Sequence, residues 1–275
     1  MLSLVPTPLG NLGDITHRAL ETLSSVDFIA AEDTRVTLKL LHYFSIKKPL
    51  LPYHRHNEER GGEEILSRLL SGESCALVSD AGSPAISDPG EDLVRRCIEA
   101  GIPVTALPGP CALTTAISIS GIATGRFTFE GFLAMNKKNR KSHLASLEKE
   151  ERTMIFYEAP HKLPQTLLDF QQTFGDQRQI SLCRELTKIH EEVLRMTIGE
   201  AISYYETVRP RGEFVLVLAG CPQEEEDFDP MPLALEELRQ ALAEGKSFSA
   251  SVKEIAKETG VAKNLLYQEG KFLIE

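Results

Sequence analysis

The stretch that most constrains the fold is residues 77–90, LVSDAGSPAISDPG. A short apolar run at 75–78 leads into it, and residues 91–100 follow with apolar side chains at helical spacing. The pattern predicts a strand, a long loop and a helix, and ligands of open α/β sheets bind at the carboxyl ends of such strands. Because the loop is long and carries glycines, prolines and aspartates, the sequence favours a ligand loop over a plain connection.

Strands and helices are expected to alternate through the first part of the chain. The expected strands lie at 2–5, 27–31, 48–53, 75–78 and 103–106, and the expected helices at 16–24, 36–44, 58–70, 91–100 and 113–120. We expect Thr16 to cap the first of these helices. The apolar face of helix 58–70 is expected to consist of Ile65, Leu66, Leu69 and Leu70. Such alternation predicts a mostly parallel sheet covered on both faces.

The pattern changes after the glycine-containing segment 121–125. Extended segments are expected at 128–131, 154–157, 180–184, 192–197 and 213–219, with the last two paired antiparallel, and helices at 141–149 and 163–174. These elements predict a second α/β domain with a mixed sheet. The expected organisation is therefore an N-terminal domain at 1–121, a second domain at 122–221, an acidic linker at 222–230 and a helical C-terminal extension at 231–275.

The C-terminal extension has two interpretations. Ala256, Val261 and Leu265 are spaced like the packed positions of a helix-turn-helix, which would favour contact with nucleic acid. Acidic and basic residues are mixed along it, however, so the pattern favours a small helical hairpin that only packs on the body.

Composition excludes several classes of protein. No apolar run approaches the length of a membrane span and no secretory signal is visible, so we expect no membrane partner and a cytoplasmic location. The five cysteines are scattered singly, which predicts reduced thiols and no metal site. The net charge of -10 argues against simple electrostatic capture of a polyanion, but a basic cluster in the second domain could still favour a phosphate-rich substrate. Its members are Lys137, Lys138, Arg140 and Lys141.

Further polar or small-residue loops follow other expected strands. In the first domain these are PTPLGNLGDIT, AEDTR and PGPCA, and in the second YEAPHK and CRELTK. Strand ends on the two domains would face each other across a cleft. The chain has no GxSxG nucleophile and no phosphate loop. From the residues alone we infer a two-domain α/β protein with a small-molecule site between the domains.

Six phrases together resemble one family. VPTPLGNLGDIT, AEDTR, VSDAGSPAISDPG, PGPCA, FYEAPHKL and CRELTKIHEE occur in the order found in the small-subunit ribosomal RNA methyltransferases of the tetrapyrrole-methylase (class III) superfamily. The resemblance covers about residues 1–220. It implies a two-domain tetrapyrrole-methylase-like α/β fold, a homodimer, S-adenosylmethionine as methyl donor, and methylation of a cytidine ribose 2′-hydroxyl in the decoding region of small-subunit ribosomal RNA. The substrate would be free RNA or the 30S subunit.

The resemblance also implies which residues hold the donor, in the cleft between the domains. The positions that match the superfamily's donor site are Leu9, Asp80, Ser83, Cys111, Ala112, Ala159 and Leu186. Similar proteins usually have serine at position 111, so a hydroxyl contact would be lost here while a backbone contact would survive. The second copy of the central phrase, at 87–90, is expected instead to cap and start the next helix.

Methyl transfer to a hydroxyl is helped by a general base and by positioning. Candidates for the base are Asp33, Glu158, Glu185 and Lys188, the lysine only if burial lowers its pKa. Arg35 and Arg184 could bind phosphates together with the basic cluster. Each of these groups could instead form structural ion pairs. The alternatives in function are a tetrapyrrole C-methylase and a ribosome-associated RNA-binding protein with a vestigial donor site; the basic cluster and the helical extension favour RNA.

Overall fold

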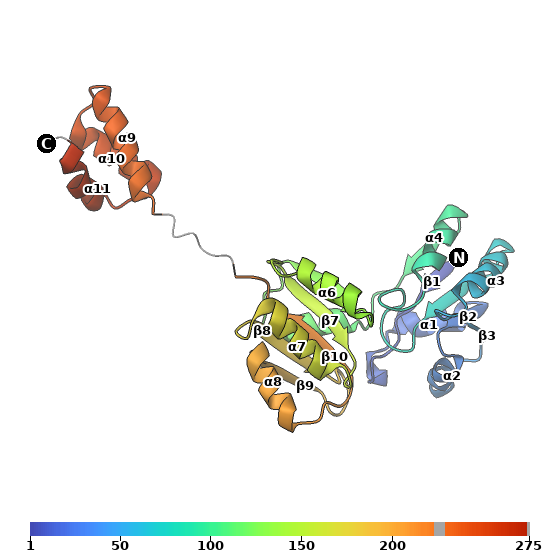
Figure 1. Ribbon diagram of the computed structural model, residues 1–275. Helices are drawn as coiled ribbons and strands as arrows, with labels where there is room; N and C mark the ends of the chain where they lie inside the picture. The colour runs from blue at the N-terminus through green and yellow to red at the C-terminus, as the bar shows by residue number, and fades with distance from the viewer. Residues whose placement is uncertain (223–228, 274–275) are drawn as a thin grey trace. The chain divides into compact units, whose positions relative to one another are not determined.

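The computed structural model describes residues 1–222 and 229–273. The chain forms two compact units, Met1–Pro222 and Gln223–Glu275, which are treated separately below (Figure 1). The acidic residues 224–227 of the expected linker lie outside the described residues. The first unit includes both expected α/β domains, and the boundary at 121–125 between them stays a prediction.

The first sheet of unit 1 is fully parallel, with strand order β3-β2-β4-β1-β5. Its strands are β1 (Leu2–Leu4), β2 (Phe28–Ala31), β3 (Leu50–Pro52), β4 (Cys75–Val78) and β5 (Val104–Ala106). Around it lie η1 (Leu12–Asp14), α1 (His17–Ser25), α2 (Thr34–Tyr43), α3 (Glu58–Leu70) and α4 (Glu91–Glu99). The predicted parallel sheet is confirmed, and Thr16 caps α1 by accepting a hydrogen bond from the Ala19 N–H.

Both faces of this sheet are covered, because its strands are apolar on both sides. On one face, Phe28 and Leu77 pack with Ile65 of α3 and Leu93 of α4. On the other face, α1 and α2 cover the alternate strand residues. The expected apolar face of α3 is wrong at Leu70, whose side chain is 62% exposed because it lies past the stripe that meets the sheet.

The second sheet is mixed and has the order β6-β7-β10-β8-β9. Its strands are β6 (Phe127–Phe132), β7 (Thr153–Glu158), β8 (Gln179–Arg184), β9 (Glu192–Thr197) and β10 (Phe214–Leu218). The expected pairing of 192–197 with 213–219 is wrong, because β8 lies between β9 and β10 and pairs with both. All five residues of β10 are buried, so it occupies a central position, whereas the half-exposed β9 forms an edge.

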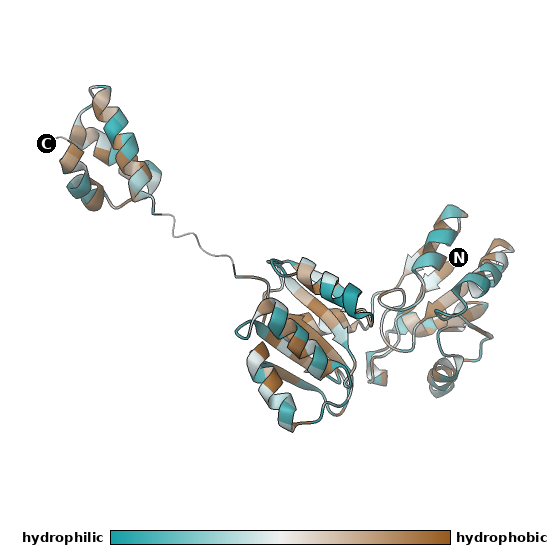
Figure 2. Cartoon of the chain, in the orientation of Figure 1, coloured by the Kyte–Doolittle hydropathy of each residue, from teal (hydrophilic) through white to brown (hydrophobic). Residues whose placement is uncertain are grey.

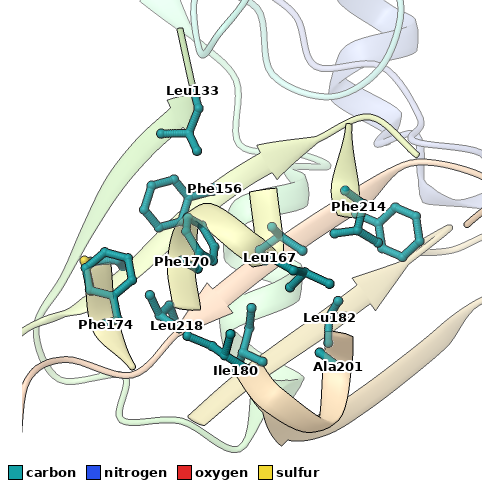
Figure 3. Packing of buried hydrophobic residues seen from close by; sticks show 14 of the residues in the cluster. Leu133, Phe156, Leu167, Phe170, Phe174, Ile180, Leu182, Ala201, Phe214 and Leu218 are labelled. Carbon is teal, nitrogen blue, oxygen red and sulfur yellow. The ribbon is translucent and has the colours of Figure 1, made fainter. Parts of the chain in front are cut away.

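The largest core of unit 1 lies on one face of this second sheet (Figure 3). Phe156, Phe170 and Phe174 stack in sequence there, with ring centroids 4.9 and 5.6 Å apart. This face is covered by α6 (Lys137–Ser146), α7 (Leu163–Phe174) and α8 (Ile198–Thr207), while α5 (Ala112–Ser120) packs on the opposite face. The strands are mostly brown and α6 largely teal in Figure 2, as expected for a sheet core and a polar outer helix.

Two elements here differ from expectation. The expected helix 141–149 begins earlier, at Lys137, because Asn136 accepts hydrogen bonds from the N–H groups of Lys138 and Asn139. The helix α8 was not predicted, although Thr197 and Glu200 form a complete capping box at its start.

The second unit is a small helical bundle of α9 (Met231–Ala243), α10 (Phe248–Thr259), α11 (Lys263–Gly270) and η2 (Lys271–Leu273). The left-handed Gly260 ends α10, as in a helix-turn-helix. Ala256 and Val261 are buried as expected, but Leu265 is 54% exposed and its neighbour Leu266 is fully buried instead. In the described ranges of the chain, every helix is too short or too polar to cross a lipid bilayer.

Candidate donor site at the strand ends

Three loops of the first sheet are tied together at the carboxyl edge of the strands. Thr7 and Gly82 exchange two backbone hydrogen bonds of 2.9 Å, and the Thr7 hydroxyl donates to the Ser79 carbonyl at 3.0 Å. The Ser83 hydroxyl donates to the Pro110 carbonyl at 3.0 Å. Because β1, β4 and β5 are parallel and β1 lies between the other two, their loops meet at one edge.

Gly82 explains why the loops can approach so closely. Its φ is +86°, in the left-handed region that favours glycine, and a Cβ there would lie 3.1 Å from Leu9 Cδ2. Ala85 and Ser87 adopt positive φ values of 65° and 66° without this freedom. Backbone strain of this kind persists where the surrounding structure over-determines it, and it concentrates at ligand sites.

A cavity of about 530 Å³ lies where these loops meet the ends of the second sheet's strands. This volume falls within the usual range of small-molecule sites. The seven residues expected to hold the donor all line it: Leu9, Asp80, Ser83, Cys111, Ala112, Ala159 and Leu186. They come from widely separated segments of the chain. The fold therefore brings together positions that only the family resemblance had assigned to one site.

Three carboxyl groups line one part of the cavity, from Glu32, Asp80 and Asp88. Burial, with the nearby charge of Glu32, raises the pKa of Asp88 to about 6. Burial and the charge of Asp80 raise the pKa of Glu32, and burial raises that of Asp80. Carboxylates of like charge that are partly removed from water attract a cation, so this part of the cavity suits a positively charged ligand group.

Another part of the wall is apolar and aromatic. Tyr157 packs edge-on against Phe129 and Phe132, with ring centroids 4.9 and 5.6 Å away, and its hydroxyl oxygen accepts a hydrogen bond from the Leu113 N–H at 3.1 Å. Leu186 and Val215 complete this wall. A ligand that carries a cation at one end and a flat ring at the other would therefore match both parts, and S-adenosylmethionine has these features.

The four expected base candidates are placed differently. Glu158, Glu185 and Lys188 line the cavity, whereas Asp33 lies beside it, with its N–H donating to Asp80 Oδ1 at 3.0 Å. Asp33 is the N-cap of α2, and the hydrogen bond from the Arg35 side chain lowers its pKa to about 2.

The other three candidates are engaged in hydrogen bonds. Glu158 is 4% exposed and accepts from the Thr166 hydroxyl at 2.5 Å and from the Ala159 N–H at 2.8 Å. Burial alone would raise the pKa of Glu185, but the hydrogen bond from Lys188 lowers it. Burial alone would lower the pKa of Lys188, yet the carboxylates of Glu185 and Glu213 raise it. Lys188 therefore does not have the lowered pKa that a lysine base needs.

The expected phosphate-binding residues lie away from this cavity. Arg35 is exposed and pairs with Asp33, and Arg184 pairs with Glu192 at 3.0 Å in a separate hollow. Arg140 is bound to Asp169 and to the Thr166 hydroxyl on the body of the unit. The exposed members of the basic cluster, Lys137, Lys138 and Lys141, lie on α6.

Sequence reasoning missed part of this site. The segment 87–90 starts α4 as expected, since its last residue Gly90 is the N-cap, but Asp88 of the same segment also lines the cavity. Tyr157 is the first residue of YEAPHK, and the sequence pattern predicted no role for its ring. The repeat of Ser-Asp in the central loop was the signal that could have identified Asp88. Across the described residues, no cluster of histidine, cysteine or acidic side chains is arranged to hold a metal ion.

The fold places the chain in a known class. A solved structure, the uroporphyrin-III-C-methyltransferase from Thermus thermophilus, superposes with a TM-score of 0.57 and 18% identity, covering 79% of this chain and 93% of that one. The family model of the Tetrapyrrole (Corrin/Porphyrin) Methylases matches residues 1–202. By fold and by its strand-end cavity, the protein is therefore a methylase of the tetrapyrrole-methylase type.

Two relatives narrow the family. A Ribosomal RNA small subunit methyltransferase I from Synechocystis is 49% identical over 98% of this chain and 96% of its own. One from Thermotoga maritima is 49% identical over 80% of this chain and 98% of its own. The chain belongs to the ribosomal RNA small subunit methyltransferase I family.

Proposed function

We propose that this protein transfers a methyl group from S-adenosylmethionine to the ribose 2′-hydroxyl of a cytidine in the decoding region of small-subunit ribosomal RNA. The single observation that supports donor binding best is the cavity, where all seven expected donor residues lie together with the carboxyl groups of Glu32 and Asp88. Membership of the family supports RNA of the small subunit as the substrate. The protein would act in the cytoplasm, as a homodimer.

S-adenosylmethionine, when bound, supplies an electrophilic methyl group on a positively charged sulfur. In our proposal, Asp80 and Glu32 attract the cationic part of the donor, and Leu186, Ala159 and Tyr157 hold its adenine. The hydrogen bond from Asp33 N–H to Asp80 Oδ1 fixes that carboxylate in place. Positioning of the ribose oxygen in line with the methyl group then provides much of the rate.

We assign the removal of the hydroxyl proton to Asp88. A general base works best when its pKa lies near the working pH, and burial raises the pKa of Asp88 to about 6. Asp33, whose pKa is about 2, is a much weaker base. Glu185 is held by Lys188 at 2.8 Å and by the Glu213 N–H at 3.0 Å, which leaves its lone pairs less available.

Mass mapping of ribosomal RNA tests the substrate. Cells that lack the protein should have lost one ribose methylation on a cytidine of the small-subunit decoding region, and the wild-type gene should restore it. A variant Asp88→Asn should restore it poorly, whereas Glu21→Gln, a change of an exposed carboxylate on α1, should restore it fully. An unchanged set of ribose methylations would overturn the proposed substrate.

Calorimetry with S-adenosylmethionine separates an enzyme from an RNA-binding protein whose donor site is vestigial. We expect saturable binding by the wild type and loss of affinity in Asp80→Ala. Absence of binding, together with full activity of Asp80→Ala, would remove the enzymatic proposal altogether.

A further inference from the structure

The loop between β8 and β9, residues 185–191, carries the most exposed large apolar side chain in the described part of the chain. Ile189 is 98% exposed at the tip of this loop. Burying apolar area is favourable, so this isoleucine would gain free energy from a contact with a partner.

This loop stands at the mouth of the donor cavity. Glu185, Leu186 and Lys188 line the cavity itself. On one side, Lys188, Ile189 and His190 face residues 10–12 across an adjoining hollow of about 600 Å³. A side chain at the tip is therefore adjacent to any molecule that enters the cavity from this side.

The loop is held firmly by its own polar groups. Lys188 Nζ donates to Glu185 Oε1 and Glu213 Oε2, each at 2.8 Å, and the Thr187 N–H donates to Glu191 Oε2 at 2.5 Å. Glu185 and Thr187 adopt left-handed φ values of 50° and 67°. An apolar tip on such a loop loses little conformational entropy when it makes a contact, which suits a wedge better than a flexible cover.

The other side of the loop suits a nucleic-acid strand. Glu185 and His190 also line a hollow of about 520 Å³ together with Tyr204, Arg209 and Arg211. Both arginines are exposed. Guanidinium groups bind phosphates and aromatic rings stack on unpaired bases, so this hollow complements RNA although the whole chain is acidic.

We propose that the loop 185–191 inserts Ile189 into the RNA base stack beside the target nucleotide and so holds that nucleotide's ribose in the cavity. This proposal rests on the proposed function. A nucleotide drawn out of its stack can bring its ribose 2′-hydroxyl into the cavity, and apolar wedges such as isoleucine stabilise the unstacked step that is left behind.

The test compares Ile189→Ala and Ile189→Asp with Ile98→Ala, a matched control at an isoleucine on α4 that is 65% exposed. Small ribosomal subunits from cells lacking the protein serve as substrate. We expect kcat/KM for the RNA to fall at least about tenfold in Ile189→Ala and further in Ile189→Asp, since unstacking costs a few kcal/mol per step. Affinity for S-adenosylmethionine should stay unchanged, and Ile98→Ala should behave like the wild type.

A second substrate distinguishes a wedge from a structural role. Subunits reconstituted with abasic riboses on both sides of the target cytidine need no unstacking there, so they should restore Ile189→Ala to the wild-type rate but leave Asp80→Ala impaired. Full activity of the Ile189 variants, loss without this rescue, or a changed oligomeric state in light scattering would overturn the wedge. Failure of the wild type to methylate either substrate would overturn the proposed function, and the wedge with it.

Discussion

At the scale of single residues, the most informative group is the carboxyl of Asp88. It lies in the segment 77–90 that follows β4, and it lines the cavity together with Glu32 and Asp80. Its pKa is raised from an ordinary value of 3.8 to about 6, chiefly by burial. A carboxylate kept in such an unfavourable environment costs stability, and the cost is expected to be recovered when a cation binds.

The first prediction concerns stability. Asp88→Asn should raise the free energy of unfolding by about 1–2 kcal/mol at pH 8 and change it little at pH 4, since the side chain is only partly exposed. Between pH 4 and pH 6 the folded wild type keeps a proton that the unfolded chain releases, so its stability falls as the pH rises through this window and stays reduced above it.

Urea denaturation at a series of pH values measures this effect, with Glu21→Gln as the control. The difference between Asp88→Asn and the wild type should open between pH 4 and pH 6. A difference that is the same at pH 4 and pH 8 would show that ionisation of Asp88 is not its cause.

The second prediction concerns ligand binding. Affinity for S-adenosylmethionine should increase as the pH rises from about 5 to 7.5, because the carboxyl groups whose pKa burial raises must ionise before they attract a cation. Calorimetry in buffers of different ionisation enthalpy would also detect the released protons. Asp88→Asn should bind with a flatter pH dependence; an equally steep profile in the variant would exclude Asp88 as its source.

At the scale of elements, glycines decide how closely the loops of the two sheets approach. Gly212, before β10, has a φ of +77°, and a Cβ there would overlap the side chain of Glu185. Gly101, just after α4, has a similar φ, +71°, but in the described part of the chain a Cβ there meets nothing within 4 Å. A comparison of alanine substitutions at the two positions therefore distinguishes the cost of backbone strain from the cost of steric overlap.

The third prediction uses this pair. Gly101→Ala should destabilise unit 1 by about 1 kcal/mol through backbone strain alone, whereas Gly212→Ala should add roughly another 1–3 kcal/mol of overlap. Only Gly212→Ala should also weaken RNA methylation, because Glu185 anchors Lys188 in the loop 185–191. Thermal denaturation and methylation assays on both variants measure these effects, and equal losses of stability would argue against the overlap.

The fourth prediction tests the start of α8. Thr197 accepts a hydrogen bond from the Glu200 N–H, and the Glu200 side chain accepts one from the Thr197 N–H. Thr197→Ala should therefore cost about 1 kcal/mol of stability. Ser203→Ala, farther along the same helix, should be neutral or slightly stabilising because alanine is the better helix former. Chemical denaturation of the two variants gives the comparison; a neutral Thr197→Ala would mean that the capping box contributes nothing.

At the scale of the whole molecule, the two units have separate hydrophobic cores. The cores of unit 1 lie around its two sheets, and the core of unit 2 is formed by residues of α9, α10 and α11 and the turn between the last two. We infer that unit 1 does not need unit 2 in order to fold.

The fifth prediction follows from this separation. A truncated protein of residues 1–222 should remain folded and should bind S-adenosylmethionine with the affinity of the full chain. Circular dichroism and calorimetry measure both properties. Any loss confined to RNA methylation would assign the helical extension to substrate contact, whereas loss of folding would contradict the independence of the two units.

The sequence by itself determined most of the elements and the class of the fold. Apolar runs and helical spacing identified β4, α3 and α7 at their observed bounds, because local periodicity reflects which side of an element is buried. It also identified the strand-end loops as the place for a ligand, since parallel strands direct their carboxyl ends to one edge.

Only the tertiary structure decided which segments meet. The order of the strands could not be read from local patterns. β8 rather than β9 pairs with β10, since the largely buried β8 takes a partner on each side whereas the half-exposed β9 lies at the edge. The raised pKa of Asp88 likewise depends on contacts between segments that are far apart in the sequence. Its chain neighbours suggest a helix cap, but its raised pKa arises from burial and from Glu32, a residue of another loop that the fold brings to the same cavity.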